Sequence, residues 1–242
     1  MLVPSDIVPG RLLGRHGRTR GPRWLNAIRS RIPWFAIRPN VALDLHEHGI
    51  VAHGAGARKS VFVPFMAMAD LCLYRTDHRL FGPANALAFR RGPDDTWIDV
   101  LDDDGDGVRL RGEIIGGQLR ERGPLALRSL EAGEVLSFHT MTDADRLAAR
   151  ARGVAAIGAT TVLQLSREGL GVDGQHIAIE DIAKLDEGGP DGSLRLLDAY
   201  GHMLWSVHTL SLFSADLFVV LMRTIIEAYQ YGITQPAPDR GT

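Results

Sequence analysis

Cysteine is almost absent from this chain of 242 residues, because Cys72 is the only one. A single thiol excludes an internal disulfide framework and any metal site that needs several thiolates. Its apolar neighbours, in the run ADLCLY, predict an inert buried thiol. The chain also lacks the G-x-S-x-G nucleophile elbow and a phosphate-binding loop. We therefore expect a protein without enzymatic activity and without a cofactor.

Long hydrophobic runs are missing as well. No uncharged stretch reaches the roughly 18 apolar residues that a membrane-spanning helix needs, and no apolar run follows basic residues at the start, as in a signal peptide. We expect a cytoplasmic protein, with a peripheral place at the inner membrane face as an alternative. At 45% hydrophobic and 23% charged residues, the chain is long enough for two globular domains.

Positive charge is concentrated near the N-terminus. Residues 1–40 hold eight arginines against one acid, Asp6, which leaves about +7 by count there and about −9 in the remainder. Aromatic and aliphatic residues interleave with the arginines, so this segment can pack or insert at an interface. We predict an arginine-rich arm over 1–40 that meets an anionic surface, an acidic partner or the chain's own acidic body. Its candidate binding residues are Arg11, Arg15, Arg18, Arg20, Arg23, Trp24, Arg29, Arg31 and Trp34.

One sequence pattern occurs twice. Period-two alternation, a turn glycine and a second apolar strand run from Leu43 to Ala52 and again from Leu163 to Val172. The pattern continues to Met66 in the first copy and to Ile182 in the second. This repeat predicts two β modules that share one architecture.

Further downstream, the run LDDDG at 101–105 matches LDAYG at 197–201, and we interpret both as hairpin turns. On this match the first copy has about 20 additional residues, an insertion near 71–96. Residues 142–152 and 214–231 carry the capping and periodicity of helices, so each copy is expected to end in a helix. The predicted modules are 41–153 and 154–232, followed by a flexible tail over 233–242.

The run GLGVDGQHIAIEDI at 169–182 resembles the start of many bacterial pleckstrin-homology-like domains. In those domains a glycine-led strand and a short turn precede an apolar strand that ends in two acids and an isoleucine. The first copy departs from this, with Pro64-Phe65 in place of the acidic pair. The resemblance covers roughly 41–232. It implies a mainly β fold with α, two tandem β-barrel or sandwich modules each closed by a C-terminal helix, and a binding or scaffolding role without catalytic residues.

The last helix has a broad apolar face. We expect it to close its own barrel and touch the neighbouring module, with a dimer or partner interface as the alternative. The interface residues are Phe218, Leu221, Met222 and Ile225.

Acidic residues after position 101 have the spacing of an EF-hand calcium loop, in which oxygen atoms converge on one cation. The candidate ligands are Asp102, Asp104, Asp106 and Glu113. The flanking residues 97–101 and 108–110 alternate like strands where an EF-hand needs helices. We therefore prefer an acidic hairpin turn and keep calcium-dependent binding as a weaker alternative.

Three histidines, His46, His48 and His53, are close enough in sequence to form a zinc or copper site if a hairpin brings them together. Only three ligands are visible, and exposed turn histidines explain the same pattern.

Two functions remain. Protein–protein interaction, with a partner or by self-association, is favoured because the β modules are acidic and their first hairpin offers only Arg58 and Lys59 as a basic cluster. Binding of an anionic membrane surface through the arm is the alternative, at about 1 kcal/mol per basic residue near the lipid. The basic residues are confined to the arm, which argues against a nucleic-acid-binding function.

Overall fold

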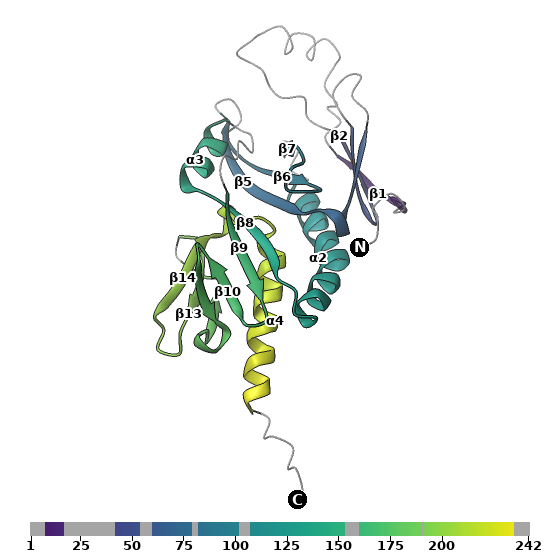
Figure 1. Ribbon diagram of the computed structural model, residues 1–242. Helices are drawn as coiled ribbons and strands as arrows, with labels where there is room; N and C mark the ends of the chain where they lie inside the picture. Colours follow the sequence, from purple (N-terminus) through teal and green to yellow (C-terminus); the bar gives the residue numbers. More distant parts are fainter. Residues whose placement is uncertain are drawn as a thin grey trace, which may run out of the picture. The chain divides into compact units, whose positions relative to one another are not determined.

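The computed structural model describes residues 8–16, 42–53, 60–78, 82–101, 107–152, 160–189 and 191–234. The chain divides into two compact units, unit 1 with residues 1–121 and 149–155 and unit 2 with 122–148 and 156–242. The described residues form four antiparallel sheets and three α-helices, which can be followed in Figure 1. The prediction of a mainly β protein with α is therefore confirmed. The recorded strand pairs close neither unit into a barrel.

Both units use the same order of elements: a four-stranded sheet, a three-stranded sheet and a long helix. In unit 1 the first sheet has the order β1 (Leu12–His16), β2 (Ala42–His46), β3 (Gly49–His53) and β4 (Val61–Pro64). The second sheet has the order β5 (Asp70–His78), β6 (Gly82–Arg90) and β7 (Ile98–Leu101). The short 3-10 helix η3 (Phe65–Ala67) joins the two sheets. Helix α2 (Gly107–Glu131) follows β7 and continues past residue 121 into unit 2.

The core of unit 1 lies where strand alternation places apolar residues. Leu43 and Leu45 of β2 are 1% exposed and pack with Ile50 of β3. Helix α2 adds Leu110 and Ile114 to the same cluster. Each such side chain stabilises the fold by about 1.5–3 kcal/mol. Cys72 is also fully buried, as predicted, and this burial raises the pKa of its thiol.

In unit 2 the first sheet contains β8 (Leu136–Met141), β9 (Thr160–Ser166), β10 (Gly169–Val172) and β11 (Gln175–Ala178). The second contains β12 (Lys184–Asp186), β13 (Ser193–Leu197) and β14 (Met203–His208). Helix η4 (Ile179–Asp181) joins the sheets, and η5 (Thr209–Ser211) leads to α4 (Ala215–Thr234).

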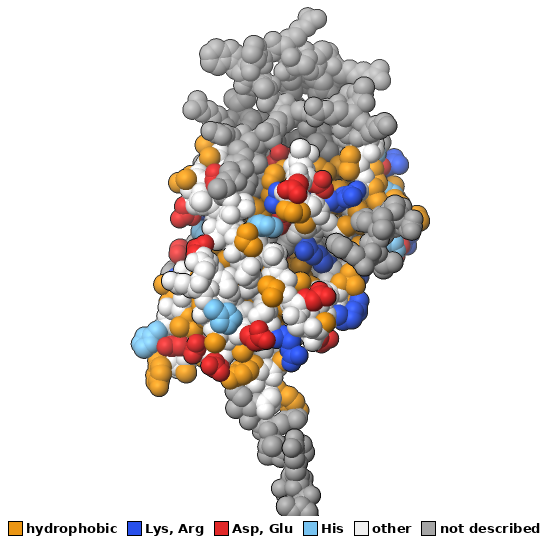
Figure 2. All heavy atoms as spheres, in the orientation of Figure 1, with side chains coloured by type: hydrophobic (Ala, Val, Ile, Leu, Met, Phe, Trp, Pro, Cys, Tyr) orange, Lys and Arg blue, Asp and Glu red, His pale blue; other side chains and the backbone are white. Residues whose placement is uncertain are grey.

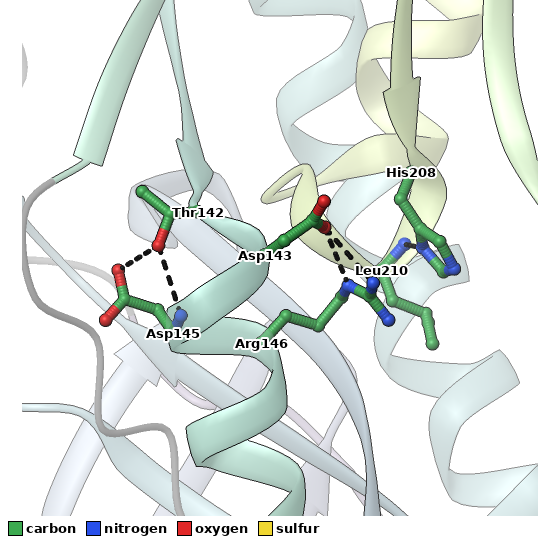
Figure 3. Close-up of polar contacts among 6 residues, drawn as sticks. All are labelled: Thr142, Asp143, Asp145, Arg146, His208 and Leu210. Carbon is green, nitrogen blue, oxygen red and sulfur yellow. Dashed lines mark hydrogen bonds and ion pairs between the residues drawn. The ribbon is translucent and has the colours of Figure 1, made fainter.

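Helix α3 (Asp143–Arg152) begins one residue after its predicted cap. The Thr142 hydroxyl accepts the Asp145 amide at 3.1 Å and donates to the Asp145 carboxylate at 2.8 Å, as Figure 3 shows. Arg146 pairs with Asp143 at 3.1 Å, and the two aspartates lie at the end of the helix where the dipole favours negative charge. In the same view, His208 accepts the amide of Leu210.

Helix α3 does not close a module, because it lies in the connection from β8 to β9. These two strands pair from Leu136 with Leu165 to Met141 with Thr160. The predicted boundary between residues 153 and 154 is therefore wrong, since it separates two paired strands.

The predicted repeat is confirmed over the first hairpin of each copy. Leu45 pairs with Ile50 in unit 1, and Leu165 pairs with Leu170 in unit 2. In each unit, the amide of the first residue of the 3-10 helix donates a hydrogen bond to the carbonyl of the residue before the turn glycine. These bonds run from Phe65 to the His48 carbonyl (3.0 Å) and from Ile179 to the Glu168 carbonyl (2.7 Å).

The repeat shifts beyond this hairpin. Gly49 pairs with Pro64, fifteen residues on, whereas Gly169 pairs with Ala178, nine residues on. Met68, rather than the predicted Met66, is thus the counterpart of Ile182. The amide of each residue donates a hydrogen bond to the carbonyl of the first residue of its own 3-10 helix.

The predicted match of 101–105 with 197–201 is wrong. Residues 198–201 form the turn between β13 and β14, whereas β7 ends at Leu101 and is followed by α2. The insertion near 71–96 is consequently also wrong, because β5 and β6 stand where β12 and β13 stand in unit 2. An aspartate and a glycine close together mark many kinds of turn, so this local pattern does not define topology.

Glycine 117 lies where α2 passes Phe65, and a Cβ there would be 2.5 Å from the ring. We expect Gly117→Ala to lower the free energy of unfolding by about 1–3 kcal/mol, because overpacking outweighs the roughly 1 kcal/mol gain in helix propensity. Gly116→Ala is the control, since its Cβ meets nothing within 4 Å, and it should be neutral or stabilising. Urea unfolding followed by circular dichroism measures both. Equal midpoints would contradict this account of the packing.

Candidate functional site

The candidate site is the basic end of unit 1, which we define as the end of its first sheet to which residues 17–41 and 54–59 attach. Residues 17–41 connect β1 to β2, and residues 54–59 lie between β3 and β4. His16 pairs with Leu43, and Ala42 pairs with His53, so the strand ends that hold these connections are neighbours. In an antiparallel sheet, alternate connections leave the same end. Both segments therefore begin and finish at one end of the sheet.

These two segments carry a large positive charge. Residues 17–41 contain six arginines and 54–59 contain Arg58 and Lys59, with no acidic residue in either segment. The corresponding connections of the second repeat differ. Residues 142–159, between β8 and β9, and residues 173–174, between β10 and β11, together hold three arginines and three aspartates, which balance. The basic end therefore distinguishes unit 1 from its repeat.

The prediction of an arm over 1–40 needs correction. Residues 12–16 form β1, which pairs with β2, so the arginines beyond residue 16 lie between two paired strands. This strand has five residues and includes Gly14, which is too short and irregular to show alternation in the sequence. Seven predicted binding residues lie outside the described residues, namely Arg18, Arg20, Arg23, Trp24, Arg29, Arg31 and Trp34.

The described side chains at the basic end are organised around Asp44. Its carboxylate lies 3.5 Å from Arg15 Nε and 3.1 Å from His53 Nε2, and His53 Nδ1 is 2.9 Å from the hydroxyl of Ser60. Asp44 itself is 14% exposed, while the Arg15 side chain is 53% exposed. Asp44 therefore lies beside one arginine and one histidine at the strand ends, and the arginine still faces solvent. Arg11 is exposed farther along the same edge of the sheet.

Ser60, His53 and Asp44 have the residue types of a nucleophile, a base and an acid. The geometry does not support that role, because His53 Nε2 makes no well-directed hydrogen bond and Ser60 is exposed on the strand edge. We therefore assign these residues an organising role at the basic end.

The predicted histidine metal site does not form. His46 Nδ1 donates to the Gly10 carbonyl at 3.1 Å, His48 pairs with Glu121 at 3.2 Å, and His53 faces Asp44. Across the described ranges, no three His, Cys, Asp or Glu side chains are grouped to hold a metal ion.

The predicted calcium loop is described only at its ends. Asp102, Asp104 and Asp106 lie outside the described residues. Glu113 lies on α2 and accepts a hydrogen bond from Arg109 Nε at 2.9 Å. The interpretation of residues 108–110 as a strand is wrong, because they belong to this helix.

The predicted interface on the last helix is buried inside unit 2. Phe218 and Met222 are fully buried, Leu221 is 2% exposed and Ile225 is 7% exposed. Phe218 makes an edge contact with Phe138 of β8, with ring centroids 5.3 Å apart. The four residues therefore form the core of their own unit, and the alternative of a partner interface is wrong for them.

Figure 2 shows acidic, basic and hydrophobic side chains interspersed over the described part of one face. None of the helices in the described ranges combines the length and the apolar character needed to cross a membrane. A scan against protein-family models finds no match, and a search of curated proteins finds no similar sequence. The fold itself defines the class of protein, a repeat of antiparallel units in which four strands, three strands and a helix follow one another.

Proposed function

We propose that this protein attaches peripherally to anionic membrane surfaces through the basic end of unit 1, and that its two units are pleckstrin-homology-like modules. The order of four strands, three strands and a helix in each unit supports the second statement. The observation that carries the first is the attachment of both basic segments to one end of one sheet.

The position of β1 reverses the preference drawn from the sequence. The first hairpin was expected to begin near Leu43 and to lack a basic cluster. With β1 placed before β2, the connection of the first hairpin is residues 17–41, which holds six arginines. This is the position at which the resemblance to pleckstrin-homology-like domains places recognition of acidic headgroups.

The magnitude of the effect is sufficient for membrane attachment. Each basic residue close to anionic lipid contributes about 1 kcal/mol, and the attraction decays over a Debye length of about 10 Å at moderate salt. Trp24 and Trp34 in the same segment are residue types that favour the membrane interface. Binding should therefore depend on anionic lipid and weaken as salt rises.

The test is co-sedimentation of the full chain with vesicles of phosphatidylcholine alone or mixed with phosphatidylserine. We expect sedimentation only with the mixed vesicles, and its loss when salt is raised from about 0.1 M to about 0.5 M. The double variant Arg58→Gln, Lys59→Gln should bind about thirtyfold more weakly, the equivalent of two charges at about 1 kcal/mol each. The matched control removes two charges from helix α3, with Arg146→Gln and Arg150→Gln.

Equal weakening by the two double variants would contradict the proposal. So would binding to phosphatidylcholine alone, or binding to a short DNA duplex without binding to the mixed vesicles. Protein interaction, which the sequence favours, remains a second proposal.

A further inference from the structure

Asp44 and His53 lie side by side at the basic end of unit 1, on the neighbouring strands β2 and β3. In the register of these strands, Ala42 pairs with His53 and Asp44 pairs with Val51. Alternate residues of a strand share one face of the sheet, so the side chains of Asp44 and His53 lie on the same face. Arg15 of β1 pairs with Asp44 and joins them on that face. The three strands therefore bring an acid, a histidine and an arginine together.

Both ring nitrogens of His53 face an oxygen atom. Nε2 lies 3.1 Å from the Asp44 carboxylate, and Nδ1 lies 2.9 Å from the hydroxyl of Ser60. A neutral imidazole carries one N–H, whereas an imidazolium carries two. The surroundings of His53 therefore suit the protonated ring, because each of its two donors would have an acceptor. The side chain is 33% exposed, so protons from the solvent can reach it.

The other described histidines near this sheet differ from His53. His16 lies on the opposite face, since it pairs with the buried Leu43, and its Nε2 is buried without a hydrogen bond in the described part of the chain. Charging that ring would bury a cation without a partner, which is costly. His46 lies at the far end of β2, where it pairs with Gly49. We therefore assign proton binding at the basic end to His53.

Protonation of His53 changes the charge of this end. The described charged groups that face it are Asp44 from β2 and, beyond Asp44, Arg15 from β1, while Ser60 is uncharged. One acid and one arginine cancel when the ring is neutral, and a net positive charge remains when it is protonated. The attached segments 17–41 and 54–59 add basic residues and no acid. An unperturbed imidazole has a pKa of about 6.5, so the change falls within the physiological range.

We propose that His53 is a pH sensor that regulates membrane attachment of unit 1. This inference rests on the proposed membrane function and adds its regulation. As the pH falls, His53 gains a proton, the charge of Asp44 is neutralised, and attraction to anionic lipid increases. As the pH rises, the proton is lost and the attraction weakens. One charge close to anionic lipid corresponds to about a fivefold change in affinity.

The experiment is co-sedimentation of the full chain with mixed phosphatidylcholine and phosphatidylserine vesicles at about pH 7.5 and about pH 5.5, on either side of the ordinary imidazole pKa. We expect about fivefold tighter binding at the lower pH. His53→Gln, which cannot become charged, should remove most of this gain. His53→Lys, which is always charged, should bind at the higher pH about as tightly as the unchanged chain binds at the lower pH.

His46→Gln is the matched control, because it removes a histidine from the opposite end of β2 and should keep the gain. Thermal unfolding at both pH values checks that each variant is folded. A gain that survives His53→Gln overturns the inference, as does an equal loss in His46→Gln. Equal binding of the unchanged chain at both pH values also overturns it and leaves the membrane proposal standing. Absence of binding at both pH values contradicts the membrane proposal itself, and the inference fails with it.

Discussion

Gly169→Ala should lower the free energy of unfolding by about 2–6 kcal/mol, a large part of the 5–15 kcal/mol that holds a typical domain together. Gly169 has a φ of +145°, a region that side-chain-bearing residues rarely adopt. A Cβ there would lie 2.0 Å from the backbone oxygen of Ile177 on the paired strand β11. The backbone of a hydrogen-bonded strand cannot move away as a flexible side chain can.

Urea unfolding is followed by tryptophan fluorescence in a background where Trp24, Trp34 and Trp97 are replaced by phenylalanine. Trp205, the one tryptophan between residues 122 and 242, then reports on unit 2. Gly174→Ala is the control, because Gly174 has a φ of +78° and an unobstructed Cβ position. Its cost should be limited to the conformational strain of about 1–2 kcal/mol. A midpoint for Gly169→Ala equal to that of Gly174→Ala would refute the steric explanation.

Arg90→Met should destabilise unit 1 by about 3–5 kcal/mol, because it leaves a buried carboxylate without its main cation. Asp70 and Arg90 face each other on β5 and β6, with side chains 3% and 11% exposed. Arg90 Nε and one terminal nitrogen both lie 2.7 Å from the same Asp70 oxygen. The guanidinium also donates to the Pro93 carbonyl and lies 4.6 Å from the centre of the Trp97 ring.

Methionine retains much of the apolar stem of arginine, so the loss measures mainly the charge. The double variant Asp70→Asn, Arg90→Met should recover part of the stability, since no ion is then buried alone. Arg146→Met is the control, because its partner Asp143 is 77% exposed and such pairs contribute less than about 1 kcal/mol. Equal losses from Arg90→Met and Arg146→Met in chemical unfolding would contradict the prediction.

The parts of the fold that were predicted correctly depend on neighbours in the sequence. The hairpins at 43–52 and 163–172 follow from alternation and one glycine, and helix α4 follows from apolar periodicity. The repeated glycine has a physical basis in both units. At Gly49 a Cβ would lie 2.4 Å from the Val63 oxygen, the same close approach as at Gly169.

Helix α2 was missed because its local preferences oppose a helix. It contains Gly116, Gly117, Gly123 and Pro124, of which an interior proline alone costs about 3 kcal/mol. Tertiary contacts offset these costs. Ile114 is fully buried in the unit 1 core, and buried Gln118 donates to the Met68 carbonyl at 3.3 Å.

The sequence by itself determined the composition and the local structure: a single cysteine, a β-rich chain with a repeated hairpin, and arginines gathered before residue 40. Only the tertiary structure decided where those arginines attach and that the predicted interface on α4 is core. The reason is physical. The alternation and periodicity of apolar residues in the sequence indicate which face of a strand or helix is apolar. The pairing of β1 with β2, which are separated by 25 residues, depends instead on contacts between residues distant in the sequence.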